Sequence, residues 1–244
     1  MKKKILVLMM VGTMALSFVA CSGSDDASKD NADTSQGGNS VSSNVEEDSS
    51  EPDDIVLVES GYSVKDNGMG NVYVYYGATL NNPNKNEAAS FPTITITAKG
   101  EDGSIIATQD QTLFYLAPED TVSFGSLVDC NGKVPTSVEI MPSCKDFVPG
   151  DSDGVIKSSD FIISNTTEIS GEYGNTSYTG EIENAGNNDA DMVAVTVILK
   201  NNGQIVYGTT TFVDGVTSGM KKPFEISAYE VPEHTEYIIS AQSW

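Results

Sequence analysis

The chain has 244 residues and a formal net charge of -22, because 35 aspartates and glutamates outnumber 13 lysines and arginines. So acidic a surface excludes nucleic acid as a partner and repels other anionic polymers. With a single histidine, a zinc site or a Ser-His-Asp triad would depend on His234 alone, which we expect in a solvated loop near the C-terminus.

Residues 1–20 have the features of an export signal. Three lysines, at positions 2 to 4, precede an apolar run from Ile5 to Ala20. The run is shorter than the roughly 20 apolar residues that a membrane span needs, and a positive start is typical of a secretory signal peptide. We expect this segment to be absent from the mature protein.

The end of the signal carries a lipidation motif. Phe18-Val19-Ala20-Cys21 resembles the bacterial lipobox, in which a bulky apolar residue and two smaller ones precede a cysteine. The resemblance implies that Cys21 takes a diacylglycerol through its sulfur and becomes the new N-terminus. Two or more acyl chains would hold the protein durably at a membrane, where one chain would be marginal. The alternative is an ordinary signal cut nearby, with Cys21 incidental.

Residues 21–53 predict a disordered acidic tether. The stretch from Ser22 onward has no aromatic residue, no leucine and no isoleucine, and is dense in Ser, Asp, Asn, Gly and Glu. Such a composition buries too little apolar surface to offset the entropy lost on ordering. The folded part would therefore be held near a membrane but clear of it.

Beyond the tether the pattern is that of an all-β chain. Runs rich in Val, Ile, Thr, Tyr and Phe are separated by turn residues, and residues 72–80 and 192–200 alternate with a period of two. Alternation places one set of side chains toward a core and the other set outward. The expected inward set is Val72, Val74, Tyr76, Ala78 and Leu80 in the first run, and Val193, Val195, Val197 and Leu199 in the second.

The two runs belong to copies of one pattern, displaced by about 100 residues. Leu80 corresponds to Ile182 and Asn82 to Asn184, and a glycine ends the predicted central hairpin turn in both copies, at 103 and at 203. About seven strand-like runs per copy favour two tandem immunoglobulin-like β-sandwich domains, at 54–150 and 151–244. The order of strands and turns resembles the FxLYD-type and related immunoglobulin-like domains of bacterial lipoproteins, which implies an extracellular β-sandwich without a catalytic motif.

Cys130 and Cys144 lie in the first domain, where an exported protein commonly bridges a pair. A hairpin around the turn at 131–132 would place them about seven residues apart along a strand, too far for a disulfide. A bridge would require the 127–136 segment to fold back, so we leave the pairing of Cys130 and Cys144 open.

Three aspartates between the domains form a weak candidate metal site. Asp151, Asp153 and Asp160 surround Gly154, and calcium binds oxygen ligands from such loops. The segment lacks the full EF-hand pattern, so a plain interdomain linker is the favoured interpretation. We expect no cofactor other than the acyl anchor.

Four aromatic residues are candidates for contact with a ligand. Tyr73 and Tyr75 lie on the face opposite the predicted core, and residues 114–116 must place Phe114 or Tyr115 outward. Exposed aromatic rings suit stacking on sugars or docking a protein. The same rings could instead be buried where the two domains meet or covered by the segment around Tyr62, and we favour such burial.

These features predict a monomeric, lipid-anchored protein on the outer face of a bacterial membrane, without enzymatic activity. Its expected task is recognition or display, with a protein or a glycan as partner. One alternative is a polysaccharide-binding accessory module that serves a separate hydrolase. Another is an envelope sensor or assembly factor.

Overall fold

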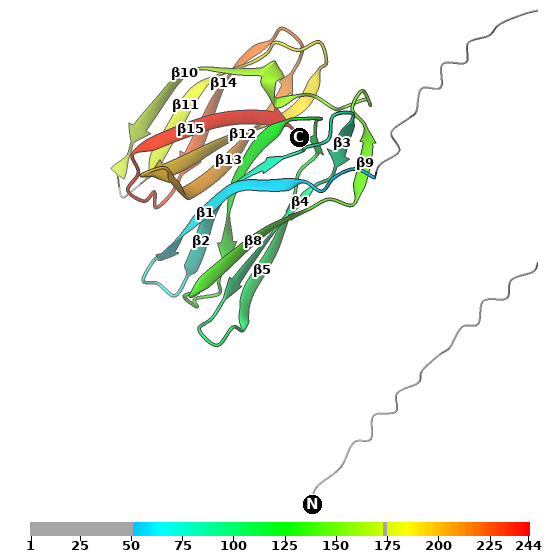
Figure 1. The fold of residues 1–244 in the computed structure, drawn as a ribbon. Helices are drawn as coiled ribbons and strands as arrows, with labels where there is room; N and C mark the ends of the chain where they lie inside the picture. Colours follow the sequence, from blue (N-terminus) through cyan, green and yellow to red (C-terminus); the bar gives the residue numbers. More distant parts are fainter. Residues whose placement is uncertain (1–50, 173–174) are drawn as a thin grey trace, which may run out of the picture. The chain divides into compact units, whose positions relative to one another are not determined.

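The computed structural model describes residues 51–172 and 175–244 (Figure 1). The segment predicted as a signal peptide, Cys21 and the predicted tether up to residue 50 lie outside the described residues. Within the described ranges no helix is long and apolar enough to cross a membrane. The expected all-β class and immunoglobulin-like sandwich architecture are confirmed.

The first sandwich contains nine strands in three antiparallel sheets, ordered β1-β2-β7, β5-β4-β8 and β6-β3-β9. Their bounds are β1 (Val56–Asp66), β2 (Val72–Asn81), β3 (Glu87–Ser90), β4 (Thr93–Lys99), β5 (Ile105–Thr112), β6 (Tyr115–Leu116), β7 (Thr121–Asp129), β8 (Ser137–Ser143) and β9 (Asp146–Pro149).

The second sandwich repeats the two larger sheets, as β10-β11-β14 and β13-β12-β15. Its strands are β10 (Phe161–Ser170), β11 (Thr176–Asn184), β12 (Ala190–Asn201), β13 (Gln204–Val216), β14 (Lys221–Ala228) and β15 (Glu236–Ser243), after a 3-10 turn at Ser158–Asp160. Because β2, β4 and β7 occupy the same places as β11, β12 and β14, the topology agrees with the repeat seen in the sequence.

Alternation placed both cores correctly. Every residue of the expected inward sets of β2 and β12 is at most 1% exposed. The predicted central hairpins are β4–β5 and β12–β13. Their turns use positive φ at Gly103, Asn202 and Gly203, where glycine and asparagine avoid the clash that other side chains meet.

A buried asparagine stands at equivalent positions in the two sandwiches, directly after β2 and at the last residue of β11. Asn82 and Asn184 are both fully buried, and each satisfies backbone groups of the loops around it. The amide of Asn82 donates to the carbonyls of Glu87 and Leu116, and that of Asn184 to the carbonyls of Asn188 and Val216. An unpaired buried carbonyl costs about 1–3 kcal/mol. The duplicated asparagine therefore stabilises the equivalent loops in both sandwiches.

The segment between β7 and β8 differs from the hairpin considered above. β7 pairs with β2 and β8 pairs with β4, so the turn at Asn131 and Gly132 passes from one sheet to the other. Cys130 and Cys144 are both free. Cys130 lies in the first core and Cys144 packs against it, and burial raises the pKa of both thiols, which keeps them protonated and unreactive.

The two sandwiches pack sheet against sheet. The outer face of β1-β2-β7 contacts β12 and β13, and Ser49–Trp244 forms one compact unit. Glycines allow the approach: a Cβ on Gly125 would lie 2.3 Å from the carbonyl carbon of Gly208, and one on Gly61 would lie 1.9 Å from the carbonyl oxygen of Ile205. The hydroxyl of Thr210 donates to the carbonyl of Gly125 at 2.9 Å across this contact.

Side chains complete the contact at its margins. Tyr75 stacks on Tyr207 with ring centroids 4.9 Å apart, and its hydroxyl donates to Glu230 at 3.4 Å. Lys200 forms an ion pair with Glu59 at 2.7 Å. Because these residues come from both sandwiches, the two repeat units are joined by direct side-chain contacts.

We predict that Gly125→Ala lowers the free energy of unfolding by about 1–3 kcal/mol, because a methyl group would force two backbones apart. Urea denaturation followed by the fluorescence of Trp244, which stacks on Phe124, measures the change. Ser126→Ala, the next residue along β7, is the control. An unchanged midpoint for Gly125→Ala would show that the sheets can separate at no cost.

Buried tyrosines make the fold sensitive to alkali. Burial, with the charge of Glu230, raises the pKa of Tyr75 to about 12, whereas an unfolded tyrosine titrates near 10.0. The stability held by the neutral hydroxyl is therefore complete below pH 10 and is lost as the pH rises toward 12. We expect the urea midpoint to fall over this range, and to fall less in Tyr75→Phe than in the exposed control Tyr229→Phe.

Candidate functional site

Three aromatic side chains gather at the end of β3 and the start of β6. Phe91 follows β3, Phe114 precedes β6 and Tyr115 begins it. The Phe91 ring lies 5.7 Å from Phe114 and 5.9 Å from Tyr115, and the last two are 4.5 Å apart. We call Phe91, Phe114 and Tyr115 the aromatic cluster.

Phe91 is unusual in both exposure and backbone. Its side chain is 54% exposed, and its φ is 52°, a left-handed conformation that bulky residues rarely adopt. It also precedes Pro92, which restricts its backbone further. Such a conformation costs of order 1–3 kcal/mol and persists only where the surroundings enforce it.

Two backbone hydrogen bonds hold this conformation. The Phe91 amide donates to the Phe114 carbonyl, and the Leu113 amide donates to the Pro92 carbonyl, both at 2.8 Å. On the other side, Gly154 lies against the rings of Phe114 and Tyr115, with φ at +85°. The fold thus keeps an apolar ring in solvent at a cost in backbone energy, which is the pattern of a recognition surface.

The four aromatic residues singled out in the sequence differ in position and in burial. Phe114 and Tyr115 belong to the aromatic cluster and are half-buried. Tyr75 does not face a ligand: it is 6% exposed and lies in the second core, as the alternative of burial between domains anticipated. Tyr73 is partly buried beside Tyr75, with the two ring centroids 6.4 Å apart.

Sequence reasoning missed Phe91, the most exposed ring of the aromatic cluster. It stands in a Ser-Phe-Pro turn between β3 and β4, so no alternation marks its direction. An isolated phenylalanine before proline, among turn residues, was the available signal.

The structure does not assemble the candidate metal site. Within 51–172 and 175–244, no three His, Cys, Asp or Glu side chains are placed to hold a metal ion. Asp151 and Asp153 are exposed on the turn after β9, while the backbone carbonyl of Asp160 accepts from Ala185 at 2.7 Å and its carboxylate lies beside Gly186. The segment acts as a linker, with Val155 packed against the first sandwich and Ile156 in the second core.

The turn after β9 also contains a motif that resembles a catalytic one and that sequence reasoning overlooked. Residues 150–154, GDSDG, match the G-x-S-x-G spacing of a nucleophile elbow. That elbow needs a strand, a sharp turn and then a helix. Here Ser152 donates from its amide to Pro149, and the chain continues as a turn and coil before the 3-10 segment at Ser158, so the required context is missing.

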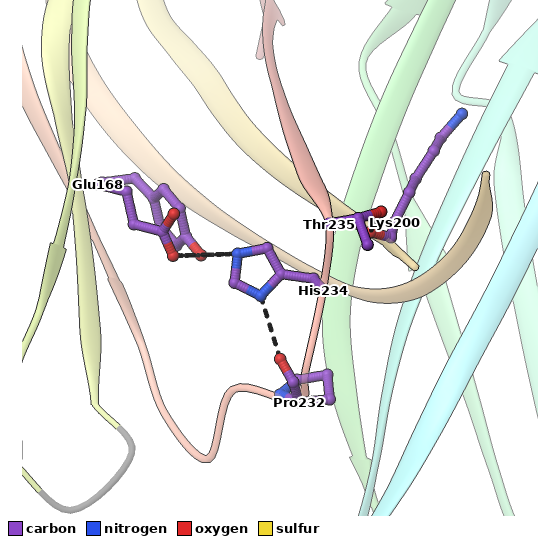
Figure 2. Close-up of polar contacts among 6 residues, drawn as sticks. Glu168, Lys200, Pro232, His234 and Thr235 are labelled. Atoms are coloured by element: carbon purple, nitrogen blue, oxygen red, sulfur yellow. Dashed lines mark hydrogen bonds and ion pairs between the residues drawn. The ribbon is translucent and has the colours of Figure 1, made fainter. Parts of the chain in front are cut away.

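His234 is not the solvated loop residue that we expected. It borders an open groove of about 540 Å³ at one end of the second sandwich, and its side chain is 15% exposed. Nδ1 donates to the Pro232 carbonyl at 3.1 Å, and Nε2 lies 3.0 Å from Glu168 Oε1 (Figure 2). The side chain of Lys200 points away from this pair in Figure 2.

These contacts form a clamp between the loop before β15 and strand β10. The hydroxyl of Tyr178 donates to Glu168 at 3.1 Å and lies 3.5 Å from Nε2. In the charged ring both nitrogens donate, Nδ1 to the Pro232 carbonyl and Nε2 to Glu168. Burial and Glu168 raise the pKa of Tyr178, so its hydroxyl keeps its proton. The contact of His234 with Glu168 thus fastens the loop before β15 to β10.

Comparisons with known proteins assign no family. No family model matches the chain, and no curated protein matches it. Among solved structures, Bacteroides uniformis β-glucuronidase 2 aligns at 14% identity and a TM-score of 0.24, over 69% of this chain and 24% of the enzyme. A glycoside hydrolase family 2 β-glucuronidase aligns at 13% identity and a TM-score of 0.22, over 74% of this chain and 21% of the enzyme. Momordica charantia 7S globulin aligns at 7% identity and a TM-score of 0.15, over 74% of this chain and 81% of the globulin. The chain therefore spans less than a quarter of the length of these glucuronidases. At such low TM-scores the similarity assigns no activity to this chain.

We predict that Phe91→Gly is more stable than Phe91→Ala by about 1 kcal/mol, because glycine adopts the left-handed conformation without a Cβ clash. Thermal or urea unfolding of the two variants measures the difference. At Met141, an exposed residue in β8, the order should reverse, since glycine weakens a regular strand. Equal stability of the two Phe91 variants would argue against backbone strain.

Proposed function

We propose that this chain is a non-enzymatic recognition protein of a bacterial surface, anchored through Cys21 and contacting a protein or glycan partner through the aromatic cluster. Support for the anchor comes from the basic start, the apolar run and the lipobox-like residues 18–21. Support for recognition comes from the aromatic cluster. The engaged nitrogens of His234 and the missing elbow context support a non-enzymatic role.

The observation that carries the proposal is the strained, exposed Phe91. A core residue would gain stability by turning inward, and a neutral surface residue would not remain in a costly backbone conformation. Phe91 neither turns inward nor relaxes: its amide donates to the Phe114 carbonyl, and the residue remains 54% exposed. Three preset rings lose little entropy on contact with a partner, which favours affinity.

The acidic chain determines which partners are compatible. Nucleic acid and anionic polymers are repelled at long range, whereas neutral or basic partners are not. The described residues begin beside the first sandwich, where the Asp53 amide donates to Asn84 at 2.8 Å. The chain that leads back to Cys21 therefore joins the fold at a fixed point of that sandwich.

We predict that Phe91→Ala and Tyr115→Ala each weaken partner binding at least tenfold, because rigid aromatic anchors dominate recognition surfaces. Cells displaying the wild type or a variant are compared for capture of fluorescent glycans and of cross-linked envelope proteins. Phe212→Ala, which removes an exposed phenylalanine on β13 of the second sandwich, is the control. Equal capture by wild type and Phe91→Ala would contradict a role for the aromatic cluster.

We also predict that the protein takes up an alkyne fatty acid in bacterial cells and that Cys21→Ala does not, because only the thiol at this position follows the lipobox-like residues. In-gel fluorescence after labelling measures uptake, and membrane fractionation shows the expected release. Cys144→Ala is the control and should label normally. Label retained by Cys21→Ala would refute the anchor.

A further inference from the structure

The outer face of β4 and β5 carries a regular array of hydroxyl groups. In β4, Ile94, Ile96 and Ala98 enter the core, so the alternate threonines face outward. The register of β5 places a polar residue opposite each of them. These pairs are Thr93 with Thr112, Thr95 with Asp110 and Thr97 with Thr108, and we call the six residues the hydroxyl ladder.

Hydrogen bonds between the strands organise the hydroxyl ladder. The hydroxyls of Thr93 and Thr112 lie 3.1 Å apart, and Thr95 donates to Asp110 at 2.7 Å. β-branched side chains have few rotamers, so their hydroxyls are held in place before any ligand arrives. The β5 members are exposed and the β4 members are half-exposed, and no other element of the described chain pairs over them.

The hydroxyl ladder begins where the aromatic cluster ends. Thr93 is two residues after Phe91, and Thr112 is two residues before Phe114. The bond between Phe91 and Phe114 joins the same two chain segments, and the Thr93 hydroxyl donates to the Phe91 carbonyl at 3.4 Å. Stacking rings and hydrogen-bonding groups are therefore continuous along one stretch of the fold.

Charge on this face is low, although the chain is strongly acidic. Asp110 is the one carboxylate in the hydroxyl ladder, and it already accepts from Thr95. On the neighbouring strand β8, Glu139 is paired with Lys99 at 2.6 Å, and Met141, 62% exposed, lies opposite Thr95. The face thus offers hydroxyls, one carboxylate and apolar surface to a partner.

We propose that the hydroxyl ladder and the aromatic cluster together bind an uncharged polysaccharide, which rests on the recognition function proposed above. Sugar rings present apolar faces that stack on aromatic rings and hydroxyls that exchange hydrogen bonds with threonine and aspartate. Thr93 to Thr97 spans roughly 13 Å along β4, so the surface fits an extended chain and exceeds one sugar. The acidic protein disfavours anionic polysaccharides.

The test uses the full lipidated chain in detergent, with affinity electrophoresis through dextran, mannan, galactomannan or mixed-linkage glucan, and through polygalacturonate as the anionic probe. Thr95→Val and Thr97→Val remove a hydroxyl at nearly constant shape, and Phe91→Ala removes the ring. Thr179→Val, on the outer side of β11 in the second sandwich, is the matched control. Melting temperatures verify that each variant is folded.

The expected result is retardation by at least one neutral polysaccharide, lost in Phe91→Ala, weakened tenfold or more in Thr95→Val and Thr97→Val, and unchanged in Thr179→Val. Binding that needs Phe91 but ignores both threonine variants overturns the hydroxyl ladder and leaves the recognition function standing. Equal or stronger retardation by polygalacturonate overturns the preference for neutral chains. If no polysaccharide retards the protein while a protein cross-links at Phe91 on cells, the proposed ligand class is wrong and the recognition function stands. If Phe91→Ala changes neither the retardation nor the cross-linking, the polysaccharide proposal and the recognition function are both overturned.

Discussion

The close approach of two β-sheets is the contact on which the rest of the structure depends. Gly125 and Gly208 bring the backbones of β7 and β13 so near that a single methyl group has no room. This contact withdraws part of the outer face of β1-β2-β7 from solvent, including Tyr75 and Thr79. Two sandwiches that the sequence describes as separate units thus share a buried boundary.

That boundary determines which surfaces can meet a partner. The rings of Tyr73 and Tyr75 on β2 pack against the second core. The opposite sheet of the first sandwich, β5-β4-β8, carries exposed residues such as Met141, and the aromatic cluster lies at its end. The left-handed backbone of Phe91 lies in the first sandwich, in the turn between β3 and β4. The contact of His234 with Glu168 lies in the second sandwich. The contact between the sandwiches and the proposed recognition surface therefore lie on different sheets of the first sandwich.

Side-chain patterns allowed much of the fold to be predicted. The alternation of 72–80 and 192–200 identified the core residues, the repeated spacing paired Asn82 with Asn184, and glycines marked both central hairpins. The pairing of β7 and β8 was harder, because the turn at Asn131 and Gly132 suits a hairpin as well as a crossing between sheets. Two of the three residues of the aromatic cluster, Phe114 and Tyr115, were candidates from the sequence, but Phe91 lies in a turn with no periodic signal.

The sequence by itself determined the all-β class, the duplicated pattern, the inward face of the central strands and the acidity, since each depends on local spacing or composition. Only the tertiary structure decided that Tyr75 is buried, that Cys130 and Cys144 stay apart, that three aspartates do not converge and that Phe91 is held outward. The physical reason is that a strand's period defines two faces but does not state which outward face another sheet will cover. That choice depends on contacts between residues far apart in the chain, such as Gly125 with Gly208.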